Sequence, residues 1–167
     1  MSHDQSHMMH TPEMQSKHKT HYRKLLIMAL LSFISMYLLM YSMIDSVRNL
    51  YPNVNQFYMA GLMTMPMIII ELIMMRSMYM NKTWNAGIIA VALIGLVGFF
   101  LCIRWQAGVS DRQFIRGMIP HHAAAILMSK KSKAKDPELV KLQQEIISSQ
   151  EREIAQMKQM LERMKNQ

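Results

Sequence analysis

The chain has 167 residues, of which 51% are apolar and 21 are methionine, and its formal net charge is +8. These averages conceal three different parts. Residues 1–24 hold five of the seven histidines, residues 25–105 are almost uncharged, and residues 106–167 contain 11 Lys or Arg and 7 Asp or Glu. This partition excludes an ordinary single soluble domain. The charge is divided as +2, +2 and +4 over the three parts, which is too dilute for a nucleic-acid-binding protein.

The amino-terminal part, residues 1–24, has no long apolar run and is predicted to be a disordered tail. It is rich in imidazole and thioether groups, a composition that binds metals without a packed core. We expect exchangeable metal binding in this tail, by ligands that include His3, His7, Met8, Met9 and His10.

The middle part, residues 25–105, contains three apolar runs long enough to cross a hydrocarbon core about 30 Å thick. They occupy residues 25–44, 57–75 and 86–103. Six Lys and Arg residues flank these runs on the side of the membrane that holds the amino terminus, and four flank them on the opposite side. This bias favours a cytoplasmic amino terminus. Three spans then place the carboxy-terminal part outside the cytoplasm. In a bacterium, this is an inner-membrane protein with a periplasmic carboxy-terminal part.

Methionines recur at three- and four-residue spacing along the first two apolar runs. In the second run this stripe also includes an acid, and an acid inside a membrane span is costly and marks a functional site by default. Two facing stripes would form a relay for Cu(I) or Ag(I), with Met63, Met67, Glu71 and Met74 in the second run. The alternative, which we favour, is that methionine replaces leucine in packing and that Glu71 is protonated or paired with Arg76.

The carboxy-terminal part, residues 106–167, is predicted to form an antiparallel helical hairpin. Ser110-Asp111 resembles a helix start, and Asp136-Pro137-Glu138 supplies a cap, a proline and an early acid for a second helix. In the first helix, residues at three- and four-residue spacing are expected to form one face. In the second helix, residues near heptad spacing are expected to form a stripe. The face comprises Phe114, Met118, His121 or His122, Ala125 and Met128, and the stripe comprises Leu139, Leu142, Ile146, Gln150, Glu153, Met157, Met160 and Met164.

One hairpin cannot bury a stripe that contains Met, Gln and Glu, whereas two hairpins supply four helices. The sequence therefore predicts a homodimer or a higher homo-oligomer formed through the hairpin. In the antiparallel arrangement, Met118 and the histidine pair lie opposite the turns at residues 153–160.

The hairpin resembles the family catalogued as domain of unknown function 305. The resemblance covers about residues 110–162 and rests on a long pattern: Asp111, Phe114, Met118-Ile119, His121-His122, Ala125, Met128, then Leu139, Ile146-Ile147, Gln150, Glu153-Ile154, Met157 and Leu161. It implies a ferritin-like fold, of which this chain carries half of a four-helix bundle, and copper binding like that of CopM-like proteins. Members commonly have two hairpins, whereas this chain has one.

Thioether and imidazole ligands suit Cu(I) and Ag(I). Met118 is three residues from His121 and four from His122, so either histidine can share its face, but the two histidines cannot both point the same way. The candidate ligands are Met118, His121, His122, Met128, Met157 and Met160, with Gln150 and Glu153 as hydrogen-bond partners that orient a ligating histidine. The alternative is that these methionines only fill a loose core.

We expect a membrane-anchored copper-binding protein that sequesters Cu(I) or hands it over, and that is not an enzyme. A di-iron carboxylate enzyme would need about four inward acids, and the hairpin offers Glu153 alone. Two other functions stay open: a copper transporter or transporter subunit that uses the membrane methionines and Glu71, and an assembly module without metal.

Overall fold

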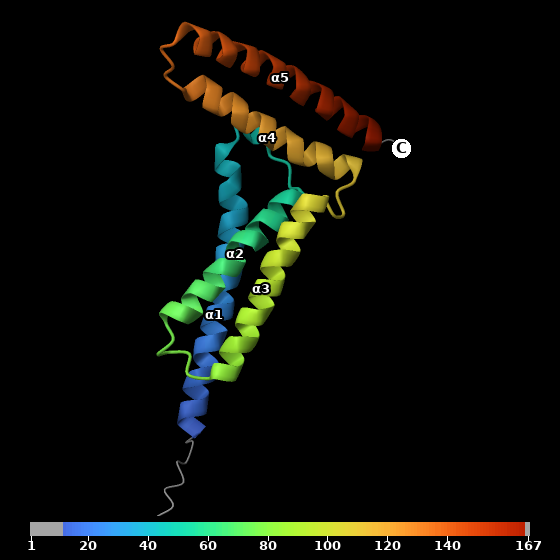
Figure 1. Cartoon of the computed structure of the whole chain (residues 1–167). Coiled ribbons are helices and arrows are strands. Elements are labelled where there is room, and N and C mark those ends of the chain that lie inside the picture. The colour runs from blue at the N-terminus through green and yellow to red at the C-terminus, as the bar shows by residue number, and fades with distance from the viewer. Residues whose placement is uncertain (1–11, 166–167) are drawn as a thin grey trace, which may run out of the picture.

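The computed structural model describes residues 12–165, with side chains from residue 20 onward. Every regular secondary-structure element among the described residues is a helix, which confirms the all-α prediction. Figure 1 shows three long helices side by side and a helical hairpin lying across one end of them. The helices are α1 (Pro12–Leu39), α2 (Val54–Met74), α3 (Lys82–Trp105), α4 (Asp111–Lys131) and α5 (Pro137–Lys165), and two 3₁₀ turns, η1 (Met40–Met43) and η2 (Val47–Asn49), connect α1 to α2.

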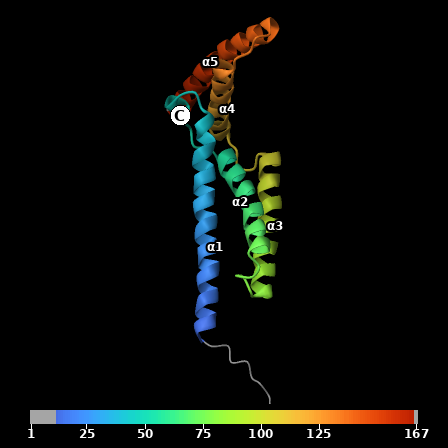
Figure 2. The ribbon, with the colours of Figure 1, turned by 90° about the vertical axis from the view of Figure 1, so that its left-hand side faces the viewer.

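Three helical segments are long and apolar enough to cross a membrane: Thr20–Met43, Val54–Met74 and Lys82–Trp105. They coincide with the three apolar runs of the sequence and extend each by a few residues. Consecutive helices run in opposite directions, so the start of α1 and the hairpin lie at opposite ends of the bundle (Figures 1 and 2).

The first helix begins earlier than expected. It starts at Pro12, so residues 12–24, which we expected in the disordered tail, are helical. The physical reason is that Pro suits a first helical position and that Glu, Met, Gln and Lys are good helix formers. Extending an existing apolar helix also avoids the cost of a new nucleus. The tail ligands His3, His7, Met8, Met9 and His10 lie outside the described residues.

The second helix lies between the other two spans and packs closely on α3. Gly61 and Gly95 make the close approach possible, because a Cβ at Gly61 would lie 2.5 Å from the ring of Phe99, and one at Gly95 would lie 2.8 Å from the sulfur of Met65. Small residues at such seams let helices approach within a membrane, where dispersion contacts replace the hydrophobic effect. The α2–α3 pair is therefore the closely packed part of the bundle.

The hairpin is attached to the end of the bundle by contacts as well as by the chain. Ile44 and Tyr51, from the connection between α1 and α2, pack against the hairpin core. The Lys158 ammonium donates to the Asn49 amide oxygen (2.6 Å), and the Val54 amide donates to the side-chain oxygen of Gln113 (3.2 Å). The position of the hairpin on the bundle is thus fixed by both apolar and polar groups.

Candidate metal centre

Both hairpin helices begin where the sequence predicts. The Ser110 hydroxyl accepts from the Gln113 amide (3.4 Å) at the start of α4, and one carboxylate oxygen of Asp136 accepts from the Glu138 and Leu139 amides at the start of α5. Side-chain caps of this kind satisfy amides that have no partner within the helix. The predicted capping residues are therefore confirmed.

The two helices are antiparallel, as expected. Arg112, at the start of α4, donates to the carbonyl of Met164, near the end of α5. Toward the other end, the Lys130 ammonium donates to Glu151 (2.7 Å), and this hydrogen bond raises the pKa of Lys130. These contacts align the sequence motifs on the two helices.

The buried face of α4 is not the one we predicted. Phe114 and Met128 are 53% and 55% exposed, and Met118 and Ala125 are only half-buried. Apolar residues recur at helical spacing on two adjacent faces of α4, and the face rich in branched Ile packs on α5. The hairpin core comprises Ile115, Ile119, Ala123, Ile126, Ile154 and Leu161, with Met157, Met160 and Met164 packed against it.

The predicted stripe of α5 is correct in its second half only. Met157, Met160 and Met164 pack on the hairpin core, whereas Leu139 and Leu142 are 45% and 49% exposed. The first turns of α5 therefore carry apolar side chains that the described chain covers only by about half.

His122 is the buried histidine of the pair, at 8% exposure. Its Nδ1 lies 2.9 Å from the carbonyl oxygen of Met118, and its Nε2 lies 2.6 Å from a carboxylate oxygen of Glu153. A carbonyl can only accept, so Nδ1 donates to it, and Nε2 faces the Glu153 carboxylate. Glu153 thus holds the position beside a histidine that we expected, and Gln150 does not.

His121 is exposed, and its ring centroid lies 6.1 Å from that of His122. The two histidines therefore point in different directions, as helical geometry requires. His121 is three residues after the half-buried Met118, so it lies beside Met118 on α4 and further from the core.

The antiparallel alignment brings two predicted methionine ligands to the same level of the hairpin. Met118 lies one turn before His122, and Met157 lies one turn after Glu153. Because His122 contacts Glu153 and the helices are antiparallel, Met118 and Met157 are opposite each other. Met160 is half-buried on the next turn of α5.

Met128 lies apart from this group. It is ten residues, or about 15 Å, further along α4 than Met118, and it is exposed. The structure thus separates Met128 from the other predicted ligands.

Hard-metal chemistry has little support in this part of the chain. Among the described residues, no three His, Cys, Asp or Glu side chains come together as a possible metal group. The predicted ligands on the hairpin carry imidazole and thioether groups, the donors that soft monovalent ions prefer.

The two membrane methionine stripes meet only in part. Met28, Met75 and Met78 pack against one apolar cluster, whereas further along α2 the contacts to α1 come from Phe57, whose ring lies 5.1 Å from that of Phe33, and from Thr64, whose buried hydroxyl lies 3.8 Å from the sulfur of Met36. Met63 and Met74 are 45% and 76% exposed, and Met67 is half-buried. The described chain therefore contains no closed thioether path through the bundle.

Glu71 has a different neighbour from the one we expected. Burial of the Tyr79 hydroxyl, and then the nearby Glu71 carboxylate, raise the pKa of Tyr79, and Arg76 is exposed. Sequence reasoning missed Tyr79 as a neighbour of Glu71 because Tyr79 lies outside the apolar runs. Only the tertiary structure brings it back toward α2.

Two comparisons with known proteins give matches. The family model described as Domain of unknown function (DUF305) matches residues 103–161. The uncharacterized protein L153 of Acanthamoeba polyphaga mimivirus is 37% identical over 144 residues, which cover 84% of this chain and 93% of that protein. No solved structure matches. The second match is much longer than the hairpin, so it includes membrane helices as well. On these matches, the chain belongs to the family described as Domain of unknown function (DUF305).

Proposed function

We propose that this protein is a membrane-anchored Cu(I)-binding protein whose hairpin holds the ion for sequestration or handover. The observation that carries the proposal is the position of Met118 opposite Met157 on the hairpin, one turn from the contact of His122 with Glu153. Thioether and imidazole donors favour Cu(I) and Ag(I) over harder ions.

The hydrogen bonds of His122 suit a ligating histidine. Nδ1 is held by the Met118 carbonyl, which fixes the tautomer and leaves Nε2 as the nitrogen for a metal. The side chain of Glu153, the present partner of Nε2, is 49% exposed, so its carboxylate has room to turn toward solvent. The ion would bind at Nε2 in the place that the Glu153 carboxylate now holds.

The membrane part would serve as an anchor. With a cytoplasmic amino terminus, the opposite end of the bundle displays the hairpin outside the cytoplasm, which in a bacterial inner membrane is the periplasm. We propose this orientation from the charge bias of the flanking segments.

We further propose that two copies pair through their hairpins into a ferritin-like four-helix bundle. Phe114, Met128, Leu139 and Leu142 are about half exposed on the hairpin. Uncovered apolar groups of this size mark an interaction surface. A second hairpin supplies the missing half of a four-helix arrangement.

The test is a Cu(I) competition titration of the full chain in detergent. We expect His122→Ala and the double variant Met118→Leu/Met157→Leu each to weaken binding by at least tenfold. Leu nearly conserves the volume of Met, so the double variant removes sulfur with little change in packing.

The matched control for this titration is Met74→Leu, which removes an exposed thioether of the membrane part. It should leave the affinity unchanged. Binding that is equal in all variants would contradict the proposal and identify the hairpin as an assembly module without metal.

A further inference from the structure

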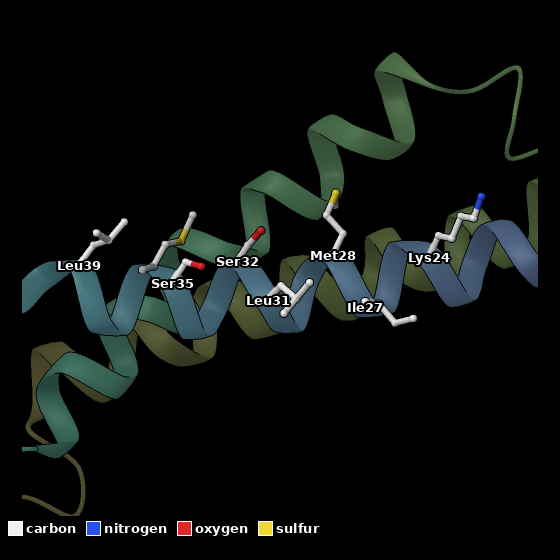
Figure 3. A pocket seen from close by; sticks show the side chains of 8 residues that line it. Lys24, Ile27, Met28, Leu31, Ser32, Ser35 and Leu39 are labelled. Carbon is white, nitrogen blue, oxygen red and sulfur yellow. The ribbon is translucent and has the colours of Figure 1, made fainter.

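The membrane face of α1 carries a groove that the copper proposal does not use. It has a volume of about 510 Å³ and is lined by α1 alone: Lys24, Ile27, Met28, Leu31, Ser32, Ser35, Met36 and Leu39. Figure 3 shows Lys24 at one end of this row and the two serine hydroxyls near its middle. It is a shallow, open groove and not an enclosed cavity.

The groove exists because two short side chains stand among long ones. Ser32 and Ser35 form the low part, and Met28, Leu31 and Leu39 rise around it (Figure 3). Leu31 and Leu39 are 59% and 67% exposed, so this side of the groove opens toward the surrounding lipid, whereas Met36, whose sulfur lies 3.8 Å from the Thr64 hydroxyl, borders α2.

The amino-terminal end of the groove is positively charged. Lys24 is exposed, and no carboxylate among the described residues forms an ion pair with it. Lys24 lies just inside the first membrane span, which begins at Thr20, at the depth where a long side chain extends its ammonium toward the lipid headgroups. A partner for this groove should therefore combine an apolar chain with an anionic group at one end.

The groove is long enough for an acyl chain of one leaflet. From Lys24 to Leu39 the helix rises about 22 Å, whereas half of the hydrocarbon core is about 15 Å. An acyl chain that starts at the headgroup beside Lys24 would run along the groove to the serine notch and end there.

We propose that this groove binds an anionic phospholipid, with the phosphate at Lys24 and one acyl chain along Met28, Leu31 and Ser35. A second copy of α1 is a less favourable occupant of the groove. If two parallel α1 helices packed together through their grooves, their Lys24 ammonium groups would lie side by side and repel each other. An anionic headgroup instead neutralises the single charge, and such attraction is worth about 1 kcal/mol per cation near a membrane surface.

The experiment is native mass spectrometry of the full chain in detergent, titrated with phosphatidylglycerol or with phosphatidylcholine of the same acyl chains. We expect phosphatidylglycerol to bind more tightly, and Lys24→Gln to weaken it about fivefold, the factor that corresponds to about 1 kcal/mol. Ser35→Leu, which fills the notch, should weaken both lipids.

Two control variants separate the groove from the general charge of this end of the bundle. Lys82→Gln removes an exposed cation at the same end, outside the groove, and Leu30→Met changes an exposed α1 side chain that does not line it. Both should bind phosphatidylglycerol like the unchanged protein. Equal losses in Lys24→Gln and Lys82→Gln, or no loss in Lys24→Gln, would overturn the proposal. So would a change of oligomeric state in Ser35→Leu with lipid binding unchanged, since the groove would then be a helix contact.

Discussion

His121 and His122 are adjacent in the chain but occupy different environments. His122 is buried and bonded at both ring nitrogens, to the Met118 carbonyl and to Glu153, whereas His121 is exposed. A buried polar group that loses its partner costs about 1–3 kcal/mol, and exposed substitutions usually change stability by less than about 0.5 kcal/mol. The two positions therefore form a natural matched pair.

We predict that His122→Ala lowers the free energy of unfolding of the hairpin by about 1–2 kcal/mol, because the variant leaves the Met118 carbonyl without its side-chain partner and opens a small cavity. His121→Ala should stay within about 0.5 kcal/mol of the unchanged protein. Chemical denaturation of the full chain in detergent, followed by circular dichroism, measures both. Equal losses would mean that the contacts of His122 contribute nothing beyond helix propensity.

At the scale of elements, the packing of α2 on α3 depends on glycines whose surroundings differ. A Cβ at Gly61 would lie 2.5 Å from the ring of Phe99, whereas one at Gly87, on α3, would have no atom within 4 Å. Inserting a methyl group into a close contact typically costs about 1–3 kcal/mol. The same substitution should thus have opposite consequences at these two sites.

We predict that Gly61→Ala lowers the thermal unfolding temperature of the detergent-purified protein, because the α2–α3 seam must open to admit the methyl group. Gly87→Ala should leave that temperature unchanged or raise it slightly, since Ala favours helix over Gly by about 1 kcal/mol. A Gly61→Ala protein as stable as the Gly87→Ala protein would show that Phe99 moves aside freely.

The membrane acid gives a second prediction at this scale. Because Met63 and Met74 are exposed and Thr64, not a methionine, lies against Met36 of α1, the two stripes form no continuous path for metal through the described chain. Copper flux into vesicles that contain the protein should therefore be the same for Glu71→Gln, Met63→Leu and the unchanged sequence. A loss of flux in either variant would favour a transporter over an anchored binding protein.

At the scale of the whole molecule, three helices that cross a membrane would place the start of α1 and the hairpin on opposite sides of it. We predict that a cysteine introduced by Ser132→Cys in a Cys102→Ser background reacts with a membrane-impermeant thiol reagent added outside intact cells, because residue 132 is exposed at the tip of the hairpin. Labelling only after lysis would reverse the orientation that we propose.

Pairing of hairpins belongs to the same scale. We predict that light scattering in mild detergent gives the mass of two chains, and that Phe114→Glu with Leu142→Glu gives one, because each introduces a charge on an apolar surface that pairing would bury. A monomeric unchanged protein would contradict the dimer.

The sequence by itself determined the helices. An apolar run of about 20 residues has few ways to satisfy its backbone in lipid except as a helix, so the three spans were readable from composition. The caps at Ser110 and Asp136 act through neighbours three residues away, and the antiparallel hairpin follows from its short connection. These features are local, and local patterns specify them.

Tertiary structure alone decided which sides of the helices meet. The sequence of α4 contains two apolar faces that are offset by one residue. Only packing against α5 decides that Ile115 and Ile119 are buried and that Phe114 and Met118 are not. In α2, Thr64 faces α1 although the methionines form the more regular stripe. The partner of Glu71 is Tyr79, in the following loop. Each outcome depends on contacts between residues distant in the chain, which spacing along one helix does not encode.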